Sequence, residues 1–189
     1  SHYVRPGSAL DLEAWERGTS VYFADQVVPM LPRELSNGIC SLNPRVDRLA
    51  LSCVMTLTPE GEVVDHTIAK SVIRTTERMT YEDCNALLAH SDPALAERYA
   101  RILPMLEDMA ALSRVLEGRR RRRGALELDT RESYVVCDES GTPVDVVLRT
   151  PGISEGLIES FMLAANECVA EHLNRLDKPC VYRVHEKPS

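Results

Sequence analysis

Alternation of hydrophobic and polar residues predicts two β-hairpins. Residues 49–57 alternate with a period of two, turn residues follow at 59–61, and a second strand is predicted over 62–74. Two further short segments, 133–137 and 144–149, flank another turn-forming stretch. Strands this close in the sequence pair antiparallel, so we expect the beginning of a sheet. The odd-numbered positions of 49–57 are all apolar and predict the core-facing side of that strand.

Apolar residues repeated at intervals of three and four predict several helices. A short helix is expected over 11–17, with Trp15 in the core, and another over 81–89, with Thr80 as its N-cap. The last helix is predicted from about 154 to 175, where one face is apolar and the other carries glutamates.

Prolines punctuate a further helical stretch. Asp92 and Pro93 form a typical N-cap and first-turn pair. The apolar stripe that follows comprises Leu95, Tyr99, Ile102, Leu103, Leu106, Met109 and Leu116. Because a proline inside a helix lacks the N–H group and clashes one turn back, Pro104 predicts either a kink or two helices that meet at Leu103.

The mixture of hairpins and helices predicts an α/β (α+β) fold, with a mixed, largely antiparallel sheet packed against several helices. No internal repeat or long linker is visible, so residues 1–189 are expected to form one unit with a substantial core. The hydrophobic content of 44% is ordinary for a globular protein, and no apolar run approaches the ~20 residues of a membrane span. With no signal sequence at the polar N-terminus, we expect a cytoplasmic location and no membrane partner.

The cysteines and histidines show no metal-binding spacing. The six cysteines form no CxxC pair and several fall at apolar positions, so buried reduced thiols are expected at Cys40, Cys53, Cys84, Cys137, Cys168 and Cys180. The five histidines are equally dispersed, without an HxxH or HExxH pattern. The residues of this chain therefore predict no metal site.

The richest candidate chemistry lies in residues 17–42. Tyr22 and Phe23 end a short β-rich run, Pro29 follows, and Pro32 begins a predicted helix of one to two turns. Each proline fixes its own φ and holds the preceding residue extended, so this loop has little conformational freedom. An aromatic pair beside a rigid loop indicates a preorganised binding surface, whereas a tyrosine in a strand, taken alone, is more often a half-buried packing residue.

A run of five arginines stands between two glycines, at Arg119, Arg120, Arg121, Arg122 and Arg123. The helix dipole favours positive charge at a helix end, which would account for two or three of them. Five consecutive cations repel one another, so the run favours a negatively charged partner, with RNA as the candidate. The net charge of −7 limits how far any basic surface extends.

Segments along the whole chain share the sequence pattern of one family. They are SHYVRPGS at the start, RGTSVYF and VVPMLPRELSNGICSLNPRVDRLALS, AKSVIRTTERMTYED at 69–83, RRRGALELD at 121–129, and LIESFMLAANECVA and YRVHEKP near the end. In these segments the chain resembles the RNB catalytic domain of the RNase II and RNase R family of 3′-to-5′ exoribonucleases. Family members bind a catalytic magnesium through aspartates upstream of the first segment and carry an essential arginine downstream of the last. The resemblance therefore implies an internal part of this domain.

The resemblance also implies three RNA-contacting residues. Tyr22 matches the family tyrosine that stacks on a base near the 3′ end of the RNA. Glu159, which by itself is one of several exposed helix carboxylates, matches a glutamate that contacts the ribose near the scissile end, where it can accept from the 2′-OH. Leu128 stands where the family usually has the second aromatic residue of the base clamp, and leucine has no π-face for stacking.

The function implied by the resemblance is part of a 3′-to-5′ exoribonuclease that hydrolyses single-stranded RNA processively to nucleoside 5′-monophosphates with Mg²⁺. No catalytic residue and no metal ligand is expected within this chain, so it should be inactive alone. The alternative is a non-catalytic RNA-binding or scaffolding module with the same fold. Because segments of the domain's sheet would be missing, exposed strand edges should favour self-association.

Overall fold

The computed structural model describes residues 2–126 and 132–184. They form two compact units, each assembled from segments that are separate in the sequence. Unit 1 draws on Ser1–Leu49, Val72–Arg78 and Asp129–Thr150, and unit 2 draws on Ala50–Ser71, Met79–Leu128 and Pro151–Ser189. The sequence predicted a single unit because no linker is visible in it. Two of the boundaries, after residues 49 and 71, fall inside strands, so no linker sequence marks them.

Helix α1 (Ala9–Arg17) of unit 1 is capped at both ends. The Ser8 hydroxyl oxygen accepts from the Asp11 N–H at 3.3 Å, and Gly18 ends the helix with a φ of 69°, which a residue without Cβ adopts readily. The prediction that Trp15 lies in the core is wrong, since this residue is 87% exposed and no residue of α1 is buried. The spacing of apolar residues predicted the helix. A residue is buried only where another element packs over it, and the spacing does not show which residues are covered in this way.

Two antiparallel hairpins belong to unit 1. Strand β1 (Val21–Tyr22) pairs with β2 (Val27–Val28), and β5 (Glu132–Cys137) pairs with β6 (Pro143–Arg149) as the alternation predicted. Throughout the described part of the chain the strands form two-stranded sheets only. The α+β fold class of helices and small antiparallel sheets is therefore confirmed.

The remaining hairpin, β3 (Asp47–Leu57) and β4 (Val63–Arg74), agrees closely with the predicted bounds. The predicted core-facing side of β3 is wrong in its first half, because Leu49 and Leu51 are exposed. From Cys53 onward the odd-numbered positions are partly covered, so the burial pattern changes phase within the strand. The alternation predicted the strand period, but the neighbouring elements decide which face is covered.

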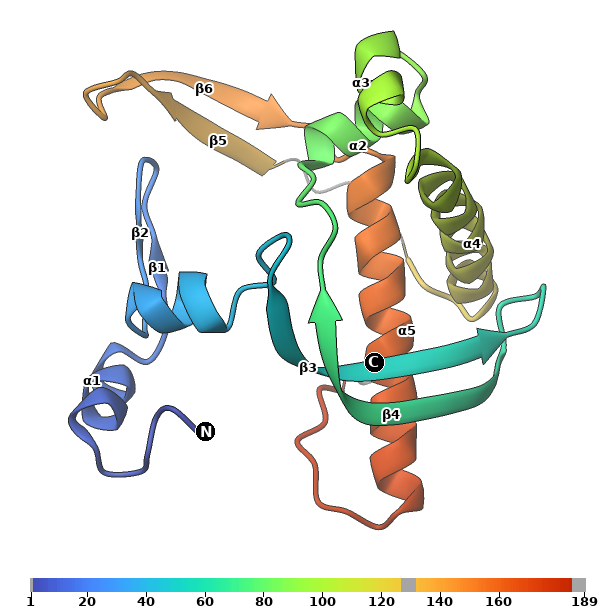
Figure 1. Cartoon of the computed structure of the whole chain (residues 1–189), viewed down its shortest axis with the longest axis horizontal. Helices are drawn as coiled ribbons and strands as arrows, with labels where there is room; N and C mark the ends of the chain where they lie inside the picture. The colour runs from blue at the N-terminus through green and yellow to red at the C-terminus, as the bar shows by residue number, and fades with distance from the viewer. Residues whose placement is uncertain (1, 127–131, 185–189) are drawn as a thin grey trace. The chain divides into compact units, whose positions relative to one another are not determined.

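Within the described residues, unit 2 contains the helices α2 (Tyr81–Leu88), α3 (Pro93–Arg98), α4 (Leu103–Arg122) and α5 (Ile153–Arg175) (Figure 1). Pro104 occupies the first turn of α4, where its missing N–H costs no hydrogen bond. The residues of the predicted stripe thus belong to two helices, α3 and α4, and α4 begins at Leu103. The alternative of one kinked helix is not observed. None of the described helices is both long and apolar enough to cross a lipid bilayer.

The core of unit 2 lies among α2, α3 and α4. Leu87, Tyr99 and Leu106 are buried there, and the predicted stripe also supplies partly buried Leu95, Ile102, Leu103 and Met109. Helix α4 packs on α5 as well, and both helices bury small side chains that allow a close approach: Ala110, Ser113, Ser160 and Cys168. Helix α5 is therefore held by several elements of unit 2 (Figure 1).

The cysteines are less buried than predicted. Cys168 is buried, Cys53, Cys84 and Cys137 are partly covered, and Cys40 and Cys180 are exposed, all six as free thiols. The prediction of burial is wrong for Cys40 and Cys180, because each follows the end of a helix rather than facing a packed element.

Candidate nucleic-acid interface

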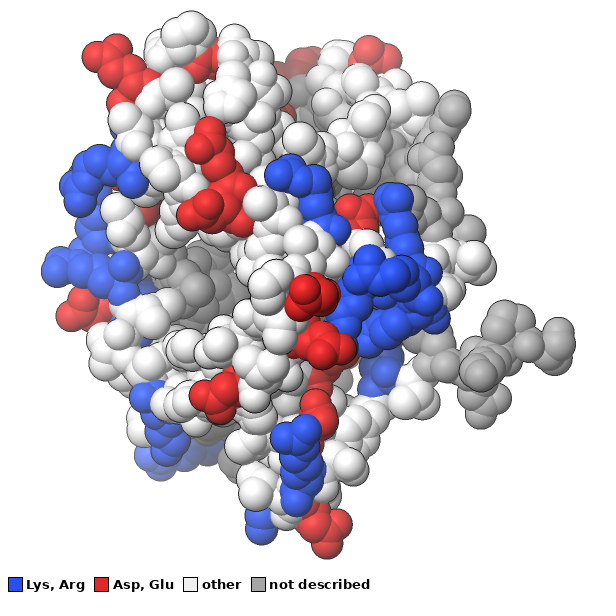
Figure 2. All heavy atoms as spheres, turned by 90° about the vertical axis from the view of Figure 1, so that its right-hand side faces the viewer, with Lys and Arg blue, Asp and Glu red and all other residues white. Residues whose placement is uncertain are grey.

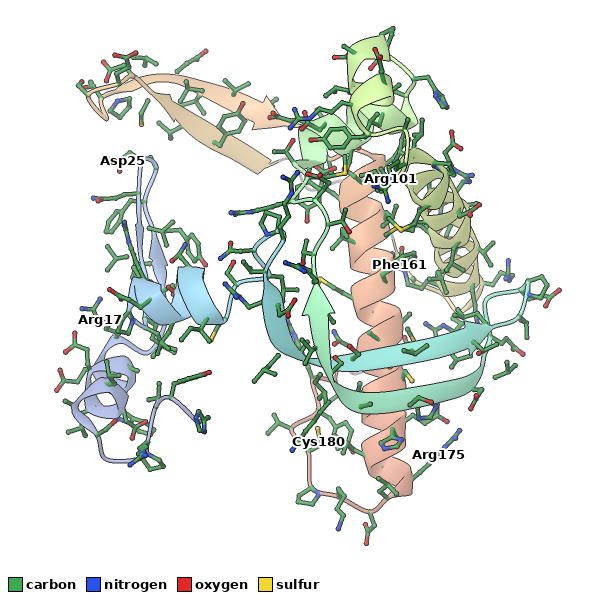
Figure 3. The ribbon with its side chains drawn as sticks, in the orientation of Figure 1. Arg17, Asp25, Arg101, Phe161, Arg175 and Cys180 are labelled. Carbon is green, nitrogen blue, oxygen red and sulfur yellow. The ribbon has the colours of Figure 1, made fainter. Side chains whose placement is uncertain are left out.

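Tyr22 lies at the end of β1, opposite Val27, in a tight hairpin of unit 1. The Phe23 N–H donates to the Gln26 carbonyl at 2.8 Å, and Asp25 stands at the tip of the hairpin (Figure 3). The residues Tyr22 and Phe23 are 77% and 57% exposed. The structure therefore does not give Tyr22 the half-buried packing role, and its ring is accessible for stacking on a base.

The base of this hairpin is tied to its flanks by hydrogen bonds. Ser20 Oγ accepts from the Met30 N–H at 3.0 Å, across the two chain ends of the hairpin. The Arg17 guanidinium of α1 donates to the Pro29 carbonyl at 3.3 Å. These contacts agree with the restricted loop that the two prolines predicted.

The helix predicted after Pro32 is confirmed, in an unexpected form. Element η1 (Glu34–Ile39) is a π-helix, and the Cys40 N–H donates to the Leu35 carbonyl five residues earlier at 2.9 Å. Leu35 is the buried residue of this turn. Wide turns of this kind are rare and often occur near functional sites.

Arg119 connects the end of α4 to the β3–β4 turn in unit 2. Its Nη1 donates to the Gly61 carbonyl at 2.8 Å, and its Nη2 lies 3.8 Å from the Glu62 carboxylate. Gly61 has a φ of 82°, and a Cβ there would lie 3.1 Å from the Val115 side chain. The turn and α4 thus approach closely, which explains the glycine at this position.

Arg120 and Arg123 connect α4 to α5. Arg120 Nη1 donates to Glu159 Oε1 at 2.8 Å, and Arg123 forms hydrogen bonds of 2.9 and 3.3 Å with the Glu167 carboxylate. The hydrogen bond with Glu167 raises the pKa of Arg123, although partial burial opposes the increase. Two predicted contact groups, the arginine run and Glu159, therefore meet in one ion pair, with side chains 23% (Arg120) and 61% (Glu159) exposed.

The rest of the run is divided between a local pair and solvent. Arg121 pairs with Glu117 at 2.9 Å within α4, whereas Arg122 is exposed and forms no salt bridge with a described residue. On the face that Figure 2 presents, acidic side chains lie directly beside the main basic cluster. Much of the positive charge of the run is therefore compensated by carboxylates of the same chain.

A cavity of ≈ 210 Å³ lies beside this end of α4. Arginine side chains line one side of it, and residues of α5 line another. The residues that bear on its chemistry are Arg119, Arg120, Arg123, Ser160, Glu167 and Cys168. With cations and carboxylates both present, the cavity has a mixed charge and is not a simple anion pocket.

Helix α5 begins at a partly buried polar network that joins it to α2. Asn85 of α2 accepts from the Ser154 N–H at 2.9 Å and donates to the Glu155 carboxylate at 3.1 Å. The same carboxylate accepts from the Gly152 N–H at 2.9 Å. Burial tends to raise the pKa of Glu155, but hydrogen bonds from Asn85, the backbone and Ser154 outweigh burial and lower it.

Two pairs of side chains in unit 2 were not predicted from the sequence. His66 Nε2 lies 2.9 Å from His172 Nδ1, and the sulfur atoms of Cys53 and Cys168 are 3.7 Å apart. Each pair joins the β3–β4 hairpin to α5 across more than a hundred residues, so no local spacing could have revealed it. Among the described residues, no group of three or more His, Cys, Asp or Glu could hold a metal ion.

Leu128 lies outside the described residues, so its predicted place in the base clamp has no structural description. Tyr22 belongs to unit 1, whereas Glu159 and the arginine run belong to unit 2. Of the predicted contact residues, the structure therefore brings Glu159 together with Arg120.

Comparison with known proteins gives matches along the whole chain. The chain is 53% identical to Ribonuclease R 1 of Lactococcus lactis and 47% identical to Ribonuclease R of Thermotoga maritima, and covers 23% and 26% of these proteins. Each alignment includes 100% of this chain. The chain therefore spans about a quarter of the length of the curated relatives it matches.

A solved structure shows the same fold. Mycoplasma genitalium RNase R in complex with ribose methylated single-stranded RNA superposes with a TM-score of 0.87 at 30% identity, over 100% of this chain and 29% of that one. The model of one family, the RNB domain, matches residues 1–189. Since the sequence match extends over every residue and the fold agrees, the chain belongs to the RNB domain family.

Proposed function

We propose that this chain is part of a 3′-to-5′ exoribonuclease that degrades single-stranded RNA processively to nucleoside 5′-monophosphates. The observation that carries the proposal is the match of residues 1–189 to the RNB domain, together with 53% identity to a Ribonuclease R. Single-stranded RNA as a partner is supported by the Mycoplasma genitalium RNase R complex, which contains such an RNA.

The proposal assigns base stacking to Tyr22. Its exposed ring, on a hairpin tied at its base, can stack on a terminal base without bonds that depend on the base's identity. Such tolerance suits an enzyme that removes every nucleotide in turn. Leu128 would supply apolar contact to a base, without a stacking face.

Glu159 is proposed to accept from a ribose 2′-OH. Its carboxylate is held by Arg120 at 2.8 Å, so one oxygen has a fixed donor while the group remains 61% exposed. An oriented, accessible carboxylate is the type of acceptor that can distinguish RNA from DNA. The exposed Arg122, with no salt bridge among the described residues, is the arginine of the run best placed for a phosphate.

We also propose that the parent protein uses magnesium as its cofactor and is located in the cytoplasm. As the resemblance to the RNase II and RNase R family implies, we assign the magnesium ligands to segments of the parent protein beyond this chain. The chain alone should then release no nucleotides.

The test compares the parent protein with the 189-residue chain on single-stranded RNA in the presence of magnesium. We expect nucleoside 5′-monophosphates from the parent and none from the chain. A parent that binds the RNA without shortening it would favour the alternative, a non-catalytic RNA-binding or scaffolding module. Monophosphate release by the chain alone would show that the metal ligands lie within the chain, which would contradict this proposal.

Self-association is a separate part of the proposal. Each described strand is hydrogen-bonded to one neighbouring strand, so its other edge is not paired with a described strand. Unpaired edges can pair with another copy. Size-exclusion chromatography of the chain over a range of concentrations should show oligomers, and a strictly monomeric chain would contradict this expectation.

A further inference from the structure

Two cysteine side chains meet between the β3–β4 hairpin and α5. The sulfur atoms of Cys53 in β3 and Cys168 in α5 lie 3.7 Å apart, although the residues are separated by 115 positions in the sequence. Cys168 is 5% exposed, and Cys53 is partly exposed. Neither residue has a role in the proposed contacts with RNA.

The distance permits a covalent bond after a small movement. A disulfide has a sulfur–sulfur length of about 2.05 Å, so the two sulfur atoms would have to approach by roughly 1.7 Å, shared between two side chains. Cys84 provides a contrast, because its sulfur lies 3.8 Å from the Met79 sulfur. Met79 has a thioether, which cannot form a disulfide.

The surroundings of the pair give the two thiols different roles. Burial raises the pKa of Cys168 to about 11, reinforced by the contact with Cys53 and by Glu171, with Arg175 opposing. Cys168 therefore stays a neutral thiol near pH 7 and is a poor first nucleophile. Cys53 is the more exposed of the two, so it meets a dissolved oxidant first.

A small molecule also has room beside Cys168, the buried member of the pair. Cys168 lines the ≈ 210 Å³ cavity next to the arginine end of α4, together with Ser160 and Glu167. A cavity of this volume accepts a molecule the size of hydrogen peroxide, since a water molecule occupies about 30 Å³ in the liquid.

We propose that Cys53 and Cys168 form a redox modification site, in which a peroxide converts the two thiols into a reversible disulfide. The Cys53 thiolate attacks a peroxide oxygen, so an S–O bond forms, the O–O bond breaks, and the released hydroxide takes up a proton to become water. The Cys168 sulfur then attacks the Cys53 sulfur. The S–S bond forms as the S–O bond breaks, and the departing hydroxide leaves as water with the Cys168 proton. Two thiols and one peroxide thus give one disulfide and two water molecules, and a thiol reductant reverses the change.

The bond would fasten the β3–β4 hairpin to α5 within unit 2. Because the cross-link closes a loop of more than a hundred residues, it restricts the unfolded chain strongly. We expect oxidation to raise the midpoint of thermal unfolding by roughly 5 to 10 °C. Reduction should restore the original midpoint.

The experiment treats the reduced chain with hydrogen peroxide, alkylates the remaining thiols, and identifies cross-linked peptides by mass spectrometry without reduction. The expected product joins the peptides that contain Cys53 and Cys168 and disappears after treatment with dithiothreitol. The variant Cys53→Ser should lose both the cross-link and the shift of the unfolding midpoint. Because Cys53 is only partly covered, this variant is expected to fold, as circular dichroism will check.

The matched control is Cys84→Ser, which removes another partly covered thiol with a sulfur neighbour and should leave the cross-link unchanged. Oxidation of Cys40 and Cys180 alone, with Cys53 and Cys168 recovered as alkylated thiols, would overturn the proposal. A Cys53–Cys168 cross-link that forms only after the chain is unfolded by urea would overturn it as well.

Discussion

In the β1–β2 hairpin, the side chains of Tyr22 and Phe23 are largely exposed, whereas most arginines at the end of α4 donate to acceptors of the chain itself. Both regions carry side chains of the kinds that bind nucleic acid. The hairpin presents its aromatic rings to solvent, and hydrogen bonds from its flanks hold its base. The arginines at the end of α4 instead form hydrogen bonds with α5 and with the β3–β4 turn.

The difference shows that residue type alone does not identify a binding surface. An aromatic ring remains available for stacking when no other element covers it. A guanidinium that is already bonded to a carboxylate has less charge to offer a phosphate, although each arginine keeps further N–H donors. We therefore expect substitutions of the paired arginines Arg119, Arg120 and Arg123 to affect mainly folding. Substitutions in the hairpin should affect mainly RNA binding.

The largest expected effect comes from disturbing the start of α5, the helix whose Glu159 and Glu167 bind arginines of the α4 end. A Cβ at Gly152 would lie 2.2 Å from Asn85 Nδ2, so Gly152→Ala should lower the free energy of unfolding by about 3 kcal/mol. Gly156→Ala is the matched control on the same helix. Apart from the neighbouring backbone of the helix itself, no described atom lies within 4 Å of a Cβ there, so this change should stabilise the protein by about 0.5 to 1 kcal/mol. Urea denaturation measures both, and equal stabilities for the two variants would contradict the described packing.

The next effect concerns the hairpin, in the full-length parent. If Tyr22 stacks on a terminal base, Tyr22→Ala should weaken binding of an RNA of a few nucleotides by roughly 1 to 3 kcal/mol. Long RNA keeps its other contacts, so the first cuts should continue while digestion stops at longer end products. Tyr22→Phe keeps the ring and should behave like the wild type. Identical end products for Tyr22→Ala and the wild type would show that Tyr22 makes no stacking contact.

A smaller effect is expected at the α4 end. Arg120→Ala removes a hydrogen-bonded ion pair to an exposed glutamate and some packing, which should cost about 1 kcal/mol of stability. Arg122→Ala removes an exposed arginine without a salt bridge among the described residues and should change stability by less than about 0.5 kcal/mol. Thermal and urea unfolding of the two variants distinguish these outcomes. A larger loss for Arg122→Ala would reverse our assignment of the two side chains.

The smallest effect is a pH dependence of the α5 start. Because the folded state lowers the pKa of Glu155, its contribution to stability is complete above the unfolded-state pKa of about 4.3 and is lost as the pH falls through the lower folded-state pKa. The variant Glu155→Gln should therefore lose less stability than the wild type between about pH 6 and about pH 3. Glu60→Gln, in the exposed β3–β4 turn, is the control and should follow the wild type. Parallel curves for Glu155→Gln and the wild type would exclude this role.

Much of the secondary structure could be predicted from local sequence. Thr80 caps α2, Asp92 caps α3, and Pro104 divides the helical stretch, because caps and prolines act through the nearest backbone groups. The bounds of the β3–β4 hairpin followed from alternation and the turn at Gly61. The exposure of Trp15 and Leu49 could not be predicted, since it depends on whether a distant element covers them.

The sequence by itself determined the family, the order of helices and strands, and the residue types available for RNA contact. Only the tertiary structure decided how those residues are used, because ion pairs and thiol contacts form between segments that the fold brings together. Arg120 lies 39 positions from Glu159, and Cys53 lies 115 positions from Cys168. Separations of this length leave no periodic signal in a single sequence, so the pairing of charges and thiols appears only when α5 has packed against α4 and the β3–β4 hairpin.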